Sequence, residues 1–211
     1  MKLELQHITK RFGKEHILNE ISYVFETPGS YAILGSNGSG KSTLLQVISG
    51  YLMPSSGQVT YSINGKALNP DHVFEEVSFC APYLELIEEM SLHEFLSYHF
   101  KFKPSLRSVD DIIEYIGLTK ASHKQISNFS SGMKQRVKLA QAIFSKTALL
   151  LLDEPCSNLD TAGYELFQKM IDDFGRQRLF IIASNDPLEY SSCQTLLPLS
   201  TLNQVPHAGI K

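Results

Sequence analysis

The chain has 211 residues, of which 43% are hydrophobic and 19% are charged, and its formal net charge is −3. Such a length can bury the core of one large domain, and a slightly acidic chain is not expected to bind mainly nucleic acid or an anionic membrane surface. The three cysteines have no metal-ligand spacing and predict buried thiols in a reducing compartment. The N-terminus has no apolar signal-peptide core, and no apolar run is long enough to span a bilayer.

The N-terminal third has the alternation of apolar and polar residues that is typical of strands. Apolar residues alternate over 3–5, 21–25, 31–34 and 59–63. The last of these segments ends at Asn64 and Gly65, a dipeptide that favours a tight hairpin turn. Between the last two segments, residues 41–52 predict a helix that ends before Pro54.

Residues 83–130 change to a helical pattern. Ser91 and Glu94 have the spacing of a capping box, and apolar residues then recur at helical spacing up to Phe100. A second helix is predicted over residues 109–116. Together these helices predict an α-helical insertion in a mixed sheet protein.

The rest of the chain alternates between helices and buried strands. Apolar stripes predict helices over 133–144 and 166–174. All-apolar runs at 149–152 and 179–183 predict parallel strands that are buried on both faces. The predicted fold class is therefore α/β with a mixed, largely parallel sheet. Residues 196–210 are expected to form a short tail.

Residues 35–42 fit the phosphate-loop pattern G-x-x-x-x-G-K-[ST] at every fixed position, between an apolar strand and a helix. Glycines let successive backbone N–H groups surround an anion, and the following helix adds its positive N-terminal end. Lys41 is expected to reach the β- and γ-phosphates of ATP, and the Ser42 hydroxyl to bind Mg²⁺. The predicted nucleotide-binding residues of this segment are Gly35, Ser36, Asn37, Gly38, Ser39, Gly40, Lys41, Ser42 and Thr43.

Two carboxylates, Asp153 and Glu154, follow the apolar run at 149–152. They would lie at the carboxyl edge of the sheet, where open α/β sheets bind ligands. Asp153 is predicted to bind Mg²⁺ or orient its water, and Glu154 to be the base that positions an attacking water. The segment alone could equally be the start of an ordinary loop, but the phosphate loop favours the catalytic interpretation.

A third motif points to a family. Residues 129–136, F-S-S-G-M-K-Q-R, resemble the L-S-G-G-Q signature of ATP-binding-cassette (ABC) ATPases, and residues 157–160 resemble the D-loop of that family. Phe12 matches the aromatic A-loop position that stacks on adenine, and residues 50–57 are similar to the usual exit from the first helix. The resemblance covers residues 1 to about 190, with the motifs in the family's order.

The resemblance implies one ABC ATPase domain over residues 1–211. Its fold would be a P-loop NTPase core with an N-terminal antiparallel β part and an inserted α-helical subdomain. The nucleotide-binding core would comprise residues 1–82 and 131–211, and the helical subdomain residues 83–130, with the signature at the end of this subdomain.

The resemblance also implies a mechanism in which two such domains, identical or different, pack head to tail. Ser130 and Gly132 of one domain would contact the γ-phosphate held by the other, with Asp160 also at the site. A helix N-terminus is a suitable place for an anion. ATP hydrolysis would then drive separate transmembrane permease subunits, with this chain in the cytoplasm at the inner face of the cell membrane.

Several of these residues have a plainer alternative. Phe12 could be an ordinary core residue. Ser130 could be only the N-cap of the helix that follows, and Asp160 could cap the next helix.

Two residues depart from the family pattern. Pro82 stands where the Q-loop glutamine is expected, and it offers Mg²⁺ or an attacking water neither a polar side chain nor a backbone N–H. Glu85 or Glu88 could reach inward instead, or remain solvated. Asn185 replaces the switch histidine, and its amide can donate a hydrogen bond but cannot carry the charge of an imidazolium. These changes predict slow hydrolysis, with Glu154 still acting as the base.

The leading interpretation is the ATP-hydrolysing subunit of a membrane transporter. One alternative is an ABC ATPase without a transport role, such as one that serves iron–sulfur assembly. Another alternative is a switch that dimerises when it binds ATP and hydrolyses the nucleotide weakly or not at all. Pro82 and Asn185 are the residues that motivate this alternative.

Overall fold

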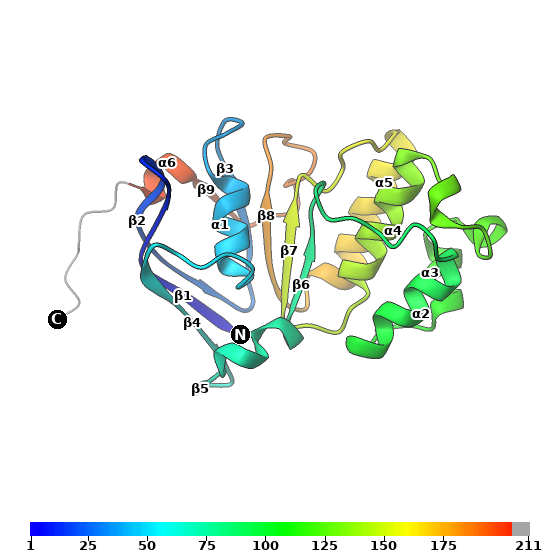
Figure 1. Ribbon diagram of the computed structural model, residues 1–211, viewed down its shortest axis with the longest axis horizontal. Coiled ribbons are helices and arrows are strands. Elements are labelled where there is room, and N and C mark those ends of the chain that lie inside the picture. The colour runs from blue at the N-terminus through cyan, green and yellow to red at the C-terminus, as the bar shows by residue number, and fades with distance from the viewer. Residues whose placement is uncertain (204–211) are drawn as a thin grey trace.

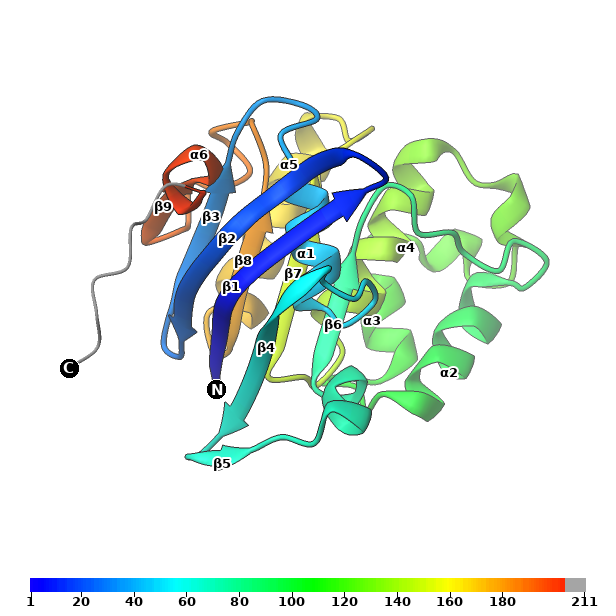
Figure 2. The same cartoon turned by 60° about the vertical axis from the view of Figure 1, so that its left-hand side comes forward.

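Two β-sheets form the framework of the computed structural model, which describes residues 1–203 (Figures 1 and 2). One sheet has five parallel strands in the order β6-β7-β8-β3-β9, and the other has four antiparallel strands in the order β2-β1-β4-β5. In chain order the strands are β1 (Lys2–Phe12), β2 (Glu15–Glu26), β3 (Ser30–Leu34), β4 (Ser56–Ile63), β5 (Lys66–Ala67), β6 (Val77–Cys80), β7 (Leu149–Asp153), β8 (Leu179–Ala183) and β9 (Thr195–Pro198).

Helices cover both faces of the parallel sheet. Helix α1 lies between the two sheets, whereas α4 and α5 pack on the opposite face and α2 and α3 lie beyond them (Figure 1). In chain order the helices are α1 (Lys41–Ile48), η1 (Pro70–Glu75), α2 (Leu92–Phe102), α3 (Val109–Tyr115), η2 (Thr119–Ala121), η3 (Ile126–Asn128), α4 (Ser131–Ile143), α5 (Thr161–Met170), η4 (Ile171–Gly175) and α6 (Leu199–Leu202).

Strand β7 illustrates why the parallel sheet is the centre of the fold. Leu149 and Leu151 belong to a hydrophobic core formed with α1 and the antiparallel sheet. Leu150 and Leu152 belong to a second core, formed with the helices on the other face. All four leucines are fully buried. A strand that is covered on both faces needs apolar residues without alternation, which is the pattern that predicted it.

Two local sequence signals are confirmed. The Glu94 amide donates to Ser91 Oγ at 3.3 Å and the Ser91 amide donates to Glu94 Oε2 at 2.9 Å, which together form the predicted capping box. Asn64 and Gly65 have φ values of 53° and 76°, as a two-residue hairpin turn between β4 and β5 requires.

The predicted boundaries were wrong at three places. Helix α1 ends at Ile48 because Gly50 takes a φ of 78°, which is a left-handed conformation that closes a helix. The predicted helix at 166–174 begins earlier, as α5, and ends in the π-helical turn η4. Part of the predicted tail is ordered structure: β9 pairs with β3, and α6 packs into the core. The rest of that predicted tail, from residue 204, lies outside the described residues.

The predicted α/β class, with its antiparallel part and inserted helices, is confirmed. The division into a core of residues 1–82 and 131–211 and a helical subdomain of residues 83–130 stays a prediction. Over residues 1–203, no helix is both long enough and apolar enough to cross a membrane.

Candidate functional site

The phosphate loop connects β3 to α1 at the carboxyl edge of the parallel sheet. Gly38 and Gly40 have φ values of 78° and 104°, which other residues rarely adopt. A Cβ atom on Gly40 would also lie 2.8 Å from Ile17 Cγ2, so close packing with β2 excludes a larger residue there. This backbone therefore requires glycine at position 40, which the motif fixes, and favours it at position 38, which the motif leaves open.

Lys41 is the first residue of α1 and is 5% exposed. Its Nζ atom donates to the carbonyl oxygens of Gly35 at 2.6 Å and Ser36 at 3.3 Å. The ammonium group is therefore held inside the turn of the loop, with its charge at the site where the motif predicts phosphate.

Asp153 is the last residue of β7 and is 2% exposed. Its Oδ1 atom is buried and has no hydrogen-bond partner among the described residues. Burial is the main reason why the pKa of this carboxyl is raised, and the hydroxyl of Ser42 and the charge of Lys41 act in the opposite direction. An unpaired buried carboxylate oxygen beside a hydroxyl is a suitable partial ligand set for Mg²⁺, which takes few protein ligands and completes its shell with phosphate and water. In the described part of the chain, no group of three or more His, Cys, Asp or Glu side chains could hold a metal ion by itself.

Glu154 follows Asp153 and has a φ of 43°, a strained conformation for a residue with a side chain. It lines a cavity of about 220 Å³ together with Phe12, the phosphate loop and the start of α1. The Phe12 ring is 52% exposed, and the Nζ of Lys10 lies 5.1 Å from its centroid. The alternative that Phe12 is a core residue is therefore wrong. The structure thus brings three predicted features to one cavity: the adenine-stacking ring of Phe12, the phosphate loop and the catalytic base Glu154.

Asn185 lies at a second cavity, of about 440 Å³, which also contains Asn37 and Glu154. The Asn185 amide donates to Asn37 Oδ1 at 2.7 Å, so it contacts the phosphate loop directly. The segment after β8 thus lies close enough to the phosphate loop for Asn185 to take part in the same site.

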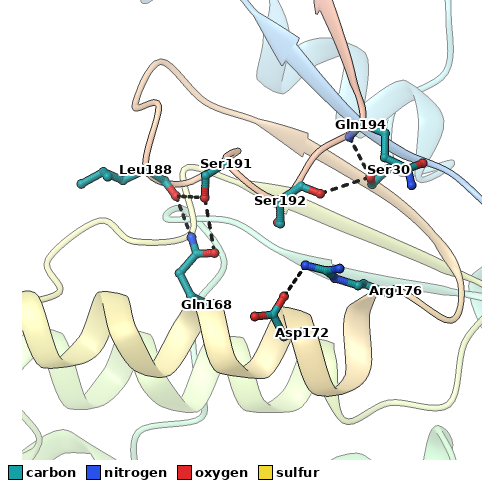
Figure 3. Close-up of polar contacts among 8 residues, drawn as sticks. All are labelled: Ser30, Gln168, Asp172, Arg176, Leu188, Ser191, Ser192 and Gln194. Carbon is teal, nitrogen blue, oxygen red and sulfur yellow. Dashed lines mark hydrogen bonds and ion pairs between the residues drawn. The ribbon is translucent and has the colours of Figure 1, made fainter.

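Hydrogen bonds hold that segment from both sides (Figure 3). Gln168 of α5 donates to the carbonyl oxygen of Leu188 at 2.6 Å. Further along, Ser30 Oγ accepts from the Gln194 amide at 2.9 Å, next to the start of β3. Asn185 is therefore presented by a braced loop that is anchored to α5 and β3.

Glu189 is a site residue that the sequence did not reveal. Its carboxyl is 4% exposed and accepts a hydrogen bond from the Cys156 amide at 2.7 Å. Burial raises its pKa, and hydrogen bonds from Ser184 and from the Cys156 amide partly oppose that shift. Tyr164 adds a second link, because its hydroxyl donates to Asp186 Oδ2 at 2.7 Å. The first contact joins the loops after β7 and β8, and the second joins α5 to the loop after β8. The sequence contains no signal that separates this glutamate from a solvated one.

The predicted signature residues Ser130 and Gly132, and Asp160 of the predicted D-loop, line neither cavity. Ser130 Oγ accepts from the Met133 amide at 3.3 Å and so caps α4. Asp160 accepts from the Gly163 amide at 2.8 Å, caps α5, and also pairs with Arg136 at 3.5 Å. Within one chain the signature is therefore not brought to the phosphate loop.

Neither glutamate near Pro82 reaches inward. Glu88 pairs with Lys134 of α4 at 2.6 Å, and Glu85 is exposed to solvent. Tyr83 of this loop, which the sequence did not single out, packs edge-on against Phe79 of β6, with 6.3 Å between the ring centroids. Burial raises the pKa of Tyr83 to about 12.

Comparisons with known proteins agree with this geometry. The family model described as ABC transporter matches residues 18–157. The uncharacterized ABC transporter ATP-binding protein YybJ of Bacillus subtilis (strain 168) is 38% identical over 164 residues, which cover 76% of this chain and 74% of YybJ. The lantibiotic transport ATP-binding protein SrtF of Streptococcus pyogenes is 28% identical over 87% of this chain and 79% of SrtF.

Solved structures give the same result for the fold. The ATP-binding subunit of an ABC transporter superposes with a TM-score of 0.79 at 23% identity, covering 94% of this chain and 87% of that one. The chain spans little more than half of some other relatives, including 56% of YdbJ from Bacillus subtilis (strain 168). On the family match and the identity to YybJ, the chain belongs to the ABC transporter family as an ATP-binding protein.

Proposed function

We propose that this chain binds ATP with Mg²⁺ and hydrolyses it slowly as the ATP-binding subunit of an ABC transporter. The observation that carries the proposal is the single cavity that joins Phe12, the phosphate loop and Glu154. Beside it, Asp153 presents a buried carboxylate oxygen without a partner.

Each residue has a role that follows from its position. The exposed ring of Phe12 stacks on the adenine base. The loop amides and Lys41 hold the phosphates, while Ser42 and Asp153 would hold Mg²⁺. When bound, that ion neutralises charge on the phosphate oxygens. Glu154 orients the attacking water and accepts its proton. The strained backbone of Glu154 supports this role, because strain of this kind concentrates at functional sites.

A second ATP-binding subunit completes the site in this proposal. Ser130 and Gly132 lie at the N-terminal end of α4, where the helix dipole favours an anion, yet they line neither of the cavities at the phosphate loop. A head-to-tail partner would bring its own signature to the γ-phosphate held by this chain. Asp160 is next to this surface through its pairing with Arg136.

A groove of about 310 Å³ supports a membrane partner. It is lined by residues that include Tyr51, Phe74, Phe79, His99 and Lys103, and Tyr51 and Phe74 are 76% and 62% exposed. Exposed aromatic side chains around a groove are typical of a protein interface. We infer that a segment of a transmembrane permease subunit binds there and holds this chain at the cytoplasmic face of the cell membrane.

A second candidate function is a switch that dimerises with ATP without hydrolysing it. The contact between Asn185 and Asn37 favours it, because a neutral amide stands where an imidazole would supply charge. Phosphate release by the wild type and by Glu154→Gln, measured with Mg²⁺ and ATP, separates the two functions. If the chain is an ATPase, the wild type releases phosphate and Glu154→Gln does not. If it is a switch, both proteins show the same background level of phosphate release.

A further inference from the structure

The end of β1 that carries Phe12 is tied to the segment that follows α1. The Lys10 ammonium group donates to the carbonyl oxygen of Met53 at 2.7 Å. Two residues further along that segment, the Ser55 amide donates to the carbonyl oxygen of Thr9, also at 2.7 Å. Backbone and side chain are thus both fixed just before Phe12, so the Lys10 ammonium group has a defined position.

That position is over the Phe12 ring, with 5.1 Å between the Lys10 Nζ atom and the ring centroid. At such a distance the positive charge is attracted to the electron-rich face of the ring. Because the ring is 52% exposed, it lacks the close packing that fixes a side chain in a core. The cation therefore adds a restraint on the orientation of a ring that is half open to solvent.

The same ring lines the cavity of about 220 Å³ that contains the phosphate loop and Glu154, whereas Lys10 does not line it. On this evidence we propose that Lys10 is a positioning residue of the ATP site. Its ammonium group holds one face of the Phe12 ring and leaves the other face to the adenine base. A ring that is ordered before the nucleotide arrives loses less conformational entropy on binding, so the base binds more tightly.

This inference rests on the proposed function, since it requires adenine to stack on Phe12. Lys10 has two plainer roles: it could only tether β1 to Met53, or its charge could attract the phosphates of ATP directly. Lys10→Gln keeps a donor for the Met53 carbonyl oxygen and removes the charge, and Lys10→Arg keeps the charge. Lys2→Gln is the matched control, because Lys2 lies at the other end of β1 and lines neither cavity.

The test is a calorimetric titration with ATP and with inorganic triphosphate, which has no base, in the presence of Mg²⁺ and with Glu154→Gln in every protein to prevent turnover. We expect Lys10→Gln to raise the Kd for ATP by about 2- to 5-fold, the effect of losing a cation–π contact at an exposed site. The Kd for triphosphate should stay unchanged. Lys10→Arg should match its parent, because a guanidinium also stacks on an aromatic ring, and Lys2→Gln should match it too.

A second comparison asks whether Lys10 acts through the ring. In a protein that also carries Phe12→Ala, Lys10→Gln should have no further effect on the Kd for ATP, because the ring that it positions is absent. A further loss of affinity there, or an equal loss of affinity for triphosphate, would overturn the inference, since Lys10 would then act on the phosphates.

Equal ATP affinities of Lys10→Gln and its parent would overturn the positioning role while leaving the ATP site intact. If the parent itself does not bind ATP, the proposed function fails, and this inference fails with it. If Lys10→Gln does not fold, as judged by circular dichroism, Lys10→Met, which also removes the charge, decides the matter in its place.

Discussion

Glu189 Oε1 accepts a hydrogen bond from the Cys156 amide at 2.7 Å, and this contact ties the loop after β8 to the loop after β7. The first loop presents Asn185 and the second begins at Glu154. Two predicted catalytic groups that follow different strands are thus linked by one buried carboxylate, which lines the same cavity as both of them.

Removing that acceptor should destabilise the protein. Glu189→Ala leaves the buried Cys156 amide without a partner and should lower the free energy of unfolding by about 1–3 kcal/mol. Glu189→Gln keeps an oxygen acceptor at the same position and should retain most of the stability. Urea unfolding of the three proteins checks this, and an alanine variant as stable as the wild type would contradict the coupling.

The same residue should make stability depend on pH. The pKa of Glu189 is raised in the folded protein, so folding favours its protonated form. Its contribution to stability is complete below the ordinary value of 4.5 and is lost as the pH rises through the raised folded value. The wild type should therefore lose stability relative to Glu189→Gln between pH 4, which lies below the ordinary value, and pH 8. Urea unfolding at both pH values measures this difference, and a constant difference would show that the carboxylate is not penalised by burial.

Phe12→Ala should weaken ATP binding without affecting the fold. Base–aromatic stacking contributes about 1–3 kcal/mol, so we expect the Kd for ATP to rise by roughly 5- to 160-fold. Because the ring is 52% exposed, the melting temperature should barely change. Phe102→Ala, at a ring that is 67% exposed on α2, is the control that should bind ATP normally. Calorimetric titration gives both Kd values, and equal affinities would remove Phe12 from the site.

Asn185→His should raise the rate of ATP hydrolysis. An imidazole at this position, next to Asn37 of the phosphate loop, could supply the positive charge that the amide lacks. Steady-state phosphate release at saturating ATP compares the two proteins. A rate in the variant that is equal to or below that of the wild type would argue against Asn185 as the cause of slow turnover.

Parts of the fold and site could be predicted from sequence because the local residues alone require them. The phosphate loop needs its glycines for backbone angles such as that of Gly40, and β7 needs four consecutive leucines because both of its faces are covered. The capping box at Ser91 is decided within one helical turn. Such features depend on few residues, and those residues are adjacent in the chain.

Other parts depend on contacts between distant segments. Strand β9 is short and ends in Pro198, so only its pairing with β3 makes it a strand. The loop at Pro82 is fixed by a hydrogen bond from Lys138, which comes 56 residues later. Glu88 and Glu189 look alike in sequence, yet one pairs with Lys134 and the other is buried.

A composite site that hydrolyses ATP can be tested by comparing the wild type with Glu154→Gln in the presence of Mg²⁺ and ATP. Phosphate release and molecular mass in solution are measured on the same samples. We expect phosphate release by the wild type alone, and a stable ATP-bound dimer of Glu154→Gln that dissociates when ATP is removed. Equal phosphate release by the two proteins, or a Glu154→Gln variant that stays monomeric with ATP, would contradict it.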